Sequence, residues 1–254
     1  MKVTFLGTGT SQGVPVIACP CEICQSSNPK DKRLRTSIKI EINNKVLVID
    51  SGPDFRQQML RSNTKQLDAL IFTHEHKDHI AGMDDIRAFN YFSKKAINIY
   101  ATTNVQDALK REFHYVFSDE KYPGIPEVKL HTINTEHPFL IEDIQVSPIK
   151  VLHYYLPVLG FRIQDFVYIT DANHIEPKEL DKIRGAKVLV LNALRRQKHI
   201  SHFTLDEAIA IVQEVKAERT FLTHISHQLG LHNEVEKELP QGIHLGFDGL
   251  ELTI

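Results

Sequence analysis

The densest group of potentially reactive side chains is the motif THEHKDH at residues 73–79. His74, His76, Asp78 and His79 lie within six positions, directly after the apolar run DALIFT (68–73). Imidazole nitrogens and carboxylate oxygens are ligands for zinc, manganese or iron. On an extended segment His74 and His76 project to the same side, whereas Asp78 and His79 enter the following turn. The spacing therefore predicts ligands divided between two metal ions.

Three further candidate ligands follow predicted strands. His153 closes IQVSPIKVLH, Asp171 follows FVYIT, and His224 follows RTFLT. Each alone is an ordinary polar residue at a strand end, but together with THEHKDH they predict one dinuclear site at a sheet edge. Two cations about 3.5–4 Å apart activate a hydroxide and stabilise the attacking and leaving oxygens of a phosphoryl displacement.

His202, in KHISHFTLD, is the candidate proton donor to the leaving group because histidine titrates in the useful range. His199 is a less well-placed competitor, and the alternative for His202 is a simple helix-entry residue. Asp50, in VIDSG, ends another strand. A carboxylate there either orients a ligating histidine or forms a turn before Gly52.

The segment ACPCEIC (18–24) holds all three cysteines of the chain, Cys19, Cys21 and Cys24. An odd count excludes a closed disulfide framework. Three clustered thiols predict a metal site, and a tetrahedral zinc site needs a fourth ligand such as histidine. Reduced, unliganded thiols are the alternative.

Composition limits the remaining choices. The 254 residues are 42% hydrophobic and 24% charged, and a single domain over residues 1–254 is expected. The net charge of -2 does not favour nucleic acid. No membrane span or signal peptide is expected, so the protein is expected to be cytoplasmic.

Short β-rich runs alternate with amphipathic helical segments, which indicates an α/β or α+β sandwich. Asn43 and Asn44 predict a hairpin, and Thr204 with Glu207 predicts a capped helix over about 205–216. The strand-like runs are VTFLG (3–7), SIKIEI (37–42), KVLVID (45–50), DALIFT (68–73), INIYA (97–101), IQVSPIKV (144–151), FVYIT (166–170), KVLVLN (187–192) and RTFLT (219–223).

Taken together, THEHKDH, His153, Asp171 and His224 resemble the metallo-β-lactamase-fold hydrolases over nearly the whole chain. That resemblance implies an α+β fold, the four-layer αβ/βα sandwich. LGTGTSQGVP, CPCEIC, LTHISHQ and the terminal GFDGLEL narrow it to the PhnP-like cyclic-phosphate phosphodiesterases.

The resemblance also implies roles for the candidate residues. His202 would contact the phosphate and protonate the leaving group, and Asp50 would be the buried aspartate behind the ligands. The implied ligand sets are His74, His76 and His153 for one ion, Asp78, His79 and His224 for the other, Asp171 as the bridge, and Cys19, Cys21, Cys24 and His227 for the structural zinc.

We therefore expect an enzyme with two active-site divalent ions, manganese or zinc, and one structural zinc. Its expected partner is a small phosphodiester, cleaved by a metal-bridging hydroxide. The alternatives are a tRNA 3′-processing-type endoribonuclease, a glyoxalase II or lactonase-type thioester or lactone hydrolase, and an inactive metal-binding scaffold. Residues 104–138 carry no interpretable motif and are interpreted as a substrate-covering loop or a homodimer contact.

Overall fold

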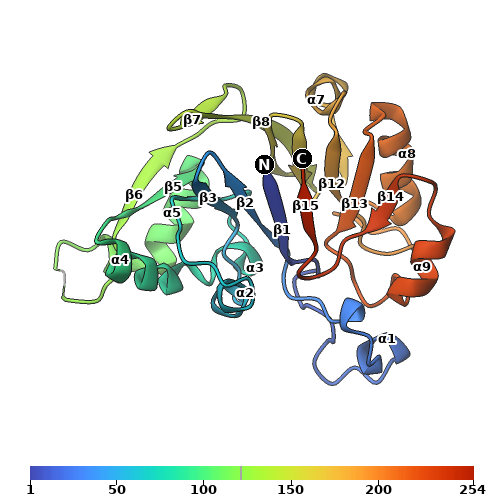
Figure 1. The fold of residues 1–254 in the computed structure, drawn as a ribbon, viewed down its shortest axis with the longest axis horizontal. Coiled ribbons are helices and arrows are strands. Elements are labelled where there is room, and N and C mark those ends of the chain that lie inside the picture. Colours follow the sequence, from blue (N-terminus) through green and yellow to red (C-terminus); the bar gives the residue numbers. More distant parts are fainter. Residues whose placement is uncertain (121) are drawn as a thin grey trace.

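Two β-sheets face each other in the computed structural model, which describes residues 1–120 and 122–254 (Figure 1). The first sheet has the order β15-β1-β2-β3-β4-β5-β6. Its strands are β1 (Lys2–Gly7), β2 (Ser37–Ile42), β3 (Lys45–Ile49), β4 (Ala69–Ile71), β5 (Ile97–Ala101), β6 (Val128–Thr132) and β15 (Glu251–Thr253).

The second sheet has the order β11-β8-β9-β10-β12-β13-β14, with β7 paired to β8. Strands β10, β12, β13 and β14 are parallel, as are β3 to β6 in the first sheet. The strands are β7 (Phe139–Ile141), β8 (Ile144–His153), β9 (Leu156–Ile163), β10 (Phe166–Ile169), β11 (His174–Ile175), β12 (Val188–Asn192), β13 (Arg219–Thr223) and β14 (Ile243–Leu245).

Helices cover the outer face of each sheet (Figure 1). None of the helices in the described residues is long and apolar enough to cross a membrane. The helices are α1 (Glu22–Gln25), α2 (Phe55–Arg61), α3 (Lys77–Ile80), α4 (Arg87–Ser93), α5 (Thr103–Glu112), α6 (His114–Phe117), α7 (Pro177–Ile183), α8 (Leu205–Val215) and α9 (His232–Glu238), with 3-10 turns at Pro29–Asp31 and Met83–Ile86.

Three buried apolar clusters show the layering. One joins both sheets, with Phe5 of β1 and Phe161 of β9 among its members. The other two lie between each sheet and its helices, around Leu109 of α5 and around Val212 of α8. Helix, sheet, sheet and helix therefore stack in the predicted four-layer αβ/βα sandwich.

The expected hairpin and the capped helix are confirmed. Asn43 and Asn44 both have positive φ, at 49° and 60°, as the tight turn between β2 and β3 requires. The Thr204 side chain accepts from the Glu207 N–H, and Glu207 returns the bond to the Thr204 N–H. This capping box begins α8 at the predicted residue.

Residues 104–138 are not a covering loop over most of their length. They contain most of α5, all of α6 and β6, and Val105, Ala108 and Leu109 of α5 are buried against the first sheet. Lys121, within the same stretch, lies outside the described residues.

Candidate metal centre

The predicted ligands meet where strands of both sheets end. THEHKDH follows β4 and leads into α3, His153 is the last residue of β8, and His224 directly follows β13. Asp171 comes two residues after β10. Because β10, β12 and β13 run parallel, their carboxyl ends reach the same edge, and the loop after β4 approaches that edge from the first sheet.

All seven predicted ligands lie in one connected cluster. Asp171 Oδ2 lies 3.2 Å from His79 Nε2 and 3.1 Å from His224 Nδ1. Asp78 Oδ2 lies 3.2 Å from the same Nε2 of His79. The candidate ligand atoms lie within 4.8 Å of one another in the groups His74–His76–His153, His74–His79–Asp171 and Asp78–Asp171–His224. Asp171 thus adjoins both sides of the cluster, as a bridging ligand would.

The hydrogen bonds of the histidines leave one nitrogen of each ring facing inward. Nδ1 of His79 donates to Asp50 Oδ2 at 2.7 Å, and Nδ1 of His153 donates to the Ser201 carbonyl at 2.8 Å. The Thr73 hydroxyl donates to Asp50 Oδ2, so its oxygen accepts from Nδ1 of His74 at 3.0 Å. Nε2 is therefore the nitrogen left available to a metal ion in all three rings.

The inward nitrogens fit a cation. Nε2 of His74 and of His79 are buried and make no hydrogen bond with any described residue. Nε2 of His79 nevertheless lies at ion-pair distance from two carboxylates, as expected when three side chains point at a common centre. Buried polar atoms without partners are costly unless a ligand satisfies them. The donor set suits a divalent transition metal.

The pKa shifts of the histidines also favour a bound metal ion. Burial lowers the pKa of His74 well below its usual value and also lowers the pKa of His153, so both rings are neutral, the form that binds metal. Burial acts in the same direction on His79, but the charges of Asp171, Asp78 and Asp50 outweigh it and raise that pKa. The three carboxylates therefore stabilise a positive charge at this position. A metal ion would supply that charge in place of the proton on His79.

Asp50 lies behind the candidate ligands His74 and His79. It is fully buried, and its Oδ1 accepts from the Thr73 N–H at 2.9 Å. Close backbone packing fixes the same loop: a Cβ on Gly52 would come 2.0 Å from the Asp78 carbonyl oxygen. Only glycine at position 52 therefore allows the Asp78 segment to approach.

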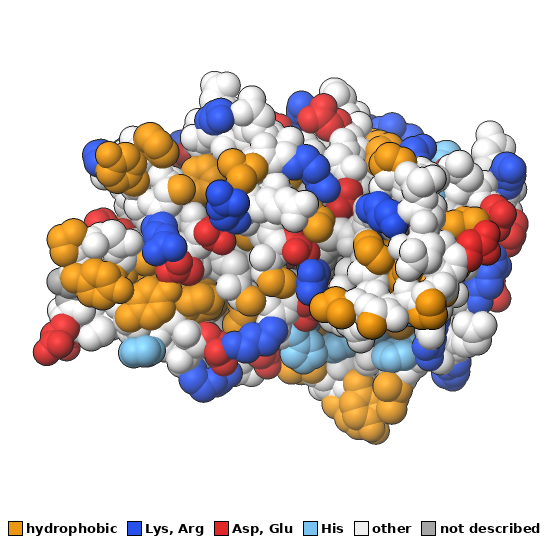
Figure 2. Space-filling view, turned by 90° about the horizontal axis from the view of Figure 1, so that it is seen from below, with side chains coloured by type: hydrophobic (Ala, Val, Ile, Leu, Met, Phe, Trp, Pro, Cys, Tyr) orange, Lys and Arg blue, Asp and Glu red, His pale blue; other side chains and the backbone are white. Residues whose placement is uncertain are grey.

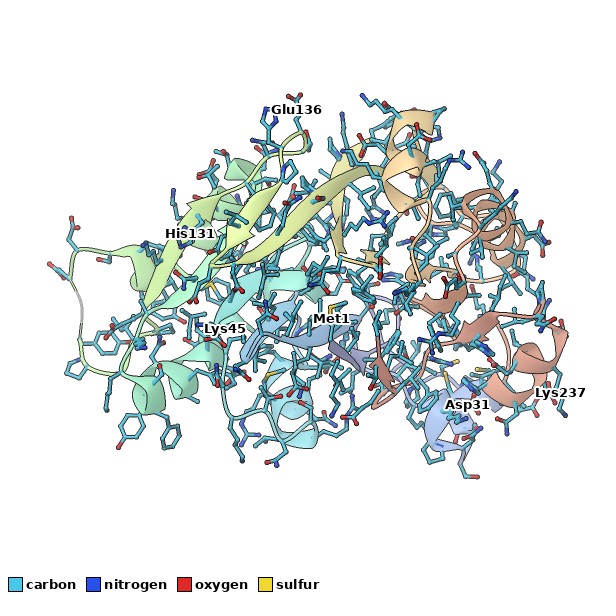
Figure 3. The ribbon with its side chains drawn as sticks, turned by 45° about the horizontal axis from the view of Figure 1, so that its top comes forward. Met1, Asp31, Lys45, His131, Glu136 and Lys237 are labelled. Carbon is cyan, nitrogen blue, oxygen red and sulfur yellow. The ribbon has the colours of Figure 1, made fainter. Side chains whose placement is uncertain are left out.

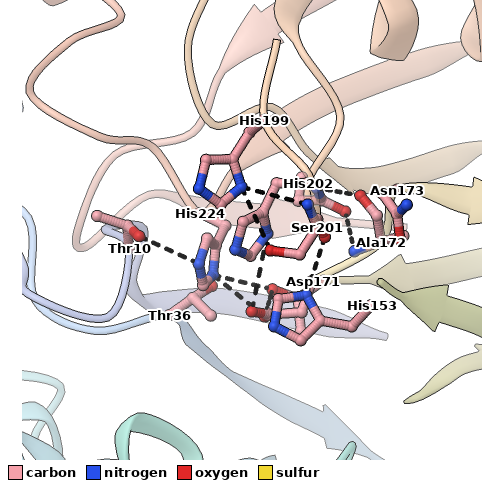
Figure 4. Close-up of polar contacts among 12 residues, drawn as sticks. Thr10, Thr36, His153, Asp171, Ala172, Asn173, His199, Ser201, His202 and His224 are labelled. Carbon is pink, nitrogen blue, oxygen red and sulfur yellow. Dashed lines mark hydrogen bonds and ion pairs between the residues drawn. The ribbon is translucent and has the colours of Figure 1, made fainter. Parts of the chain in front are cut away.

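His202 lines the opposite side of the cluster. Its side chain is 9% exposed, and its Nδ1 lies 3.9 Å from Asp171 Oδ1 with no hydrogen-bond partner among the described residues. Burial lowers its pKa. His199, the competitor, is less buried and bonds the Ser201 hydroxyl at 3.2 Å, as Figure 4 shows. Histidine side chains reach the surface in the lower part of the face in Figure 2, between hydrophobic side chains and beside charged ones.

Four supporting residues were missed by sequence reasoning. Thr73 connects Asp50 to His74, and the Thr10 hydroxyl lies 3.2 Å from Nε2 of His224. The Asn192 amide bonds both the N–H and the carbonyl of Ala172, next to Asp171. Asn173 joins the β8–β9 turn to the His202 loop. The one signal that could have indicated these four residues is that each lies close to a motif or to a strand end.

The three cysteines converge on His227. The Sγ atoms of Cys19, Cys21 and Cys24 lie 3.4, 3.3 and 3.6 Å from its Nδ1. A hydrogen bond with His227 lowers the pKa of Cys21 to about 6, whereas burial raises that of Cys24 to about 11. Sulfur atoms gather near the labelled Asp31 in Figure 3. Three thiols and one imidazole in contact fit a tetrahedral zinc site.

The fold and this edge of the sheets define a metallo-β-lactamase-type hydrolase. The sequence model described as the beta-lactamase superfamily domain matches residues 45–225, and the chain belongs to that superfamily. Within it the chain is a PhnP-like protein: a crystal structure described as a new diphosphatase from the PhnP family superposes with a TM-score of 0.93 at 38% identity. That match covers 100% of this chain and 97% of the other.

Curated relatives share parts of the sequence. An octanoyltransferase of Porphyromonas gingivalis is 40% identical over 100% of this chain and 52% of its own length. A ribonuclease Z of Acaryochloris marina is 30% identical over 65% of this chain and 48% of its own length. The chain thus spans about half the length of the curated relatives it matches. A human short-form tRNase Z structure, at 19% identity and a TM-score of 0.74, shares the fold.

Proposed function

We propose that this chain is a phosphodiesterase with two divalent ions at its active site, and that it opens small phosphodiesters, with five-membered cyclic phosphates favoured. The observation that carries the proposal is the pairing of the ligand cluster with His202. The groups His74–His76–His153 and Asp78–Asp171–His224 share one edge. Beside Asp171 lies the buried His202, whose Nδ1 has no hydrogen-bond partner in the described part of the chain.

When bound, the two ions would supply Lewis acidity toward phosphoryl oxygens and a hydroxide at neutral pH. The chain supplies orientation and a proton. Asp50 and Thr73 hold the tautomers of His79 and His74. His202 would donate its proton to the departing ester oxygen. The negative charge of a bound phosphodiester opposes the burial that lowers the pKa of His202, and so favours its protonated form.

The PhnP-family structure supports a phosphorus substrate, because its description names a diphosphatase. The ribonuclease Z relatives support the endoribonuclease alternative, but the match to the Acaryochloris protein covers only 65% of this chain. An acyl substrate is the other alternative, and because the Porphyromonas relative is an octanoyltransferase, an octanoyl thioester is a suitable probe.

The test is a substrate panel with manganese and with zinc. It comprises cyclic phosphodiesters, linear phosphodiesters, a diphosphate diester, an octanoyl thioester and a tRNA precursor. We expect cyclic phosphodiesters to give the highest kcat/KM, and His202→Ala to lower kcat by about 10²–10⁴-fold, the usual range for a general acid. His199→Ala is the matched control, and we expect it to lower kcat much less than His202→Ala does. Thioester turnover that His202→Ala leaves unchanged, with no phosphodiester activity, would overturn the proposal.

A further inference from the structure

A group of exposed apolar side chains borders the candidate metal centre. Tyr155 is 77% exposed, Ile200 is 64% exposed and Tyr154 is 43% exposed. We call these three residues the apolar rim. Tyr154 directly follows the candidate ligand His153, and Ile200 lies two residues before His202. The rim is thus continuous in sequence with both sides of the reaction site.

Asn173 holds the two parts of the rim together. Its Oδ1 accepts from the Tyr154 N–H at 2.7 Å, and its Nδ2 donates to the Ile200 carbonyl at 3.2 Å. Its own N–H donates to the Leu152 carbonyl at 2.8 Å. A single amide side chain therefore fixes the turn after β8 against the loop that carries His202, and Figure 4 shows this loop beside His153.

The turn itself is strained. Tyr154 has a φ of 58°, in the left-handed region that glycine and asparagine adopt at lower cost than an aromatic residue. Tyr154 and Tyr155 alone connect β8 to β9, and their rings lie 3.9 Å apart between centroids. Strained backbone that surrounding contacts hold in place clusters at ligand-binding sites.

The rim belongs to the two segments that carry His153 and His202. His153 and His202 have ring centroids 4.6 Å apart, and Nδ1 of His153 bonds the Ser201 carbonyl between Ile200 and His202. The group that His202 would protonate therefore departs next to the turn and the loop that carry these exposed side chains. Aromatic faces bind planar rings by offset stacking, in addition to the burial of apolar area.

We propose that the apolar rim determines specificity: it binds a planar ring carried by the leaving group of the substrate, with Tyr155 as the stacking residue and Asn173 as the positioning residue. The proposal rests on the proposed phosphodiesterase function. It narrows the substrate class to phosphodiesters whose departing alcohol or phenol bears an aromatic or heteroaromatic ring.

Nonhydrolysable phosphonates separate binding from catalysis. Calorimetry of the metal-loaded protein would compare phenylphosphonate, cyclohexylphosphonate and methylphosphonate. We expect phenylphosphonate to bind about tenfold more tightly than methylphosphonate, and cyclohexylphosphonate to fall between them, because it buries area without stacking. Tyr155→Ala should reduce the phenyl preference to about twofold, Tyr155→Phe should keep it, and Asn173→Ala should lower it in part while the Tyr155 ring remains.

Tyr91→Ala is the matched control, since Tyr91 is 67% exposed on α4, over the outer face of the first sheet. It should leave the preference unchanged. A phenyl preference that survives Tyr155→Ala, or equal affinities for phenyl and cyclohexyl, would overturn the rim proposal and leave the proposed function standing. If none of the phosphonates bound, both proposals would fall together.

Discussion

Oδ2 of Asp50 lies 2.7 Å from Nδ1 of His79, and neither side chain is exposed to solvent. This carboxylate fixes the ring so that Nε2 faces Asp78 and Asp171. Partners of this kind affect metal affinity by about 10–100-fold when they are replaced.

Asp50→Asn is expected to weaken metal binding at the centre by a factor in that range, because an amide oxygen accepts the Nδ1 proton without the negative charge. Metal titration against a competing chelator would measure the change. Asp165→Asn, which removes a surface partner of Lys187, is the control. Equal affinity in Asp50→Asn and the wild type would contradict this role.

Gly52→Ala should disturb the same loop through its backbone. The added Cβ would meet the Asp78 carbonyl oxygen at 2.0 Å, so that segment must shift. We expect a loss of about 1–3 kcal/mol in the free energy of unfolding and weaker metal binding at the centre. Gly185→Ala is the comparison. Apart from its two chain neighbours, no described residue comes within 4 Å of a Cβ at this position, although its φ of 71° is unfavourable for alanine. It should cost about 1–2 kcal/mol and leave metal content unchanged.

Removing one thiol should release the structural ion and little else. Cys21→Ser is expected to lower the bound metal by one ion per chain and Tm by about 6–12 °C, as loss of about 3 kcal/mol implies for a chain of this size. Elemental analysis and thermal unfolding would measure both. An unchanged metal content would leave the three thiols as unliganded groups.

A pH dependence of stability should arise at His232. Arg33, fully buried, donates from Nη2 to Nδ1 of His232 at 3.1 Å, and burial together with that charge lowers the pKa of His232 to about 4. The unfolded ring has a pKa near 6.5, so between pH 6.5 and 4 the unfolded chain binds the extra proton. The contribution of His232 to the free energy of unfolding is therefore fully present above pH 6.5 and decreases as the pH falls toward 4.

His232→Asn keeps an acceptor for Arg33 and removes the titration. Urea unfolding at pH 7.5 and at pH 5 should show a smaller loss of stability on acidification in this variant than in the wild type. The exposed His137→Asn should match the wild type. If the stability of all three proteins depended on pH in the same way, His232 would not be the source of this pH dependence.

The convergence of the candidate ligands could be predicted because they either form one dense motif or follow apolar runs of strand length. His153, Asp171 and His224 all end such runs, and parallel strands carry their carboxyl ends to one edge. The cysteine cluster was visible for a similar reason, since three thiols share six residues. The spacing of residues within short segments was therefore sufficient to predict the candidate ligands.

Elements whose turns lack ordinary turn residues were harder to predict. Strand β9 follows a two-residue turn made of Tyr154 and Tyr155, with no glycine or asparagine to signal it. Helix α5 buries Val105, Ala108 and Leu109, but prolines and aromatic residues further along suggested a loop. Asn173 and Thr10 act through contacts that depend on the folded arrangement of distant segments, and no spacing rule reveals those.

Asp50, Asp171 and His224 share left-handed backbone angles, with φ of 64°, 57° and 56°. Each such conformation costs a non-glycine residue roughly 1–2 kcal/mol. Glycine would adopt all three freely, but it would carry no carboxylate or imidazole. Replacing any of the three by glycine would thus relieve backbone strain and remove a candidate ligand or its partner, so stability and metal binding make opposite demands on these positions.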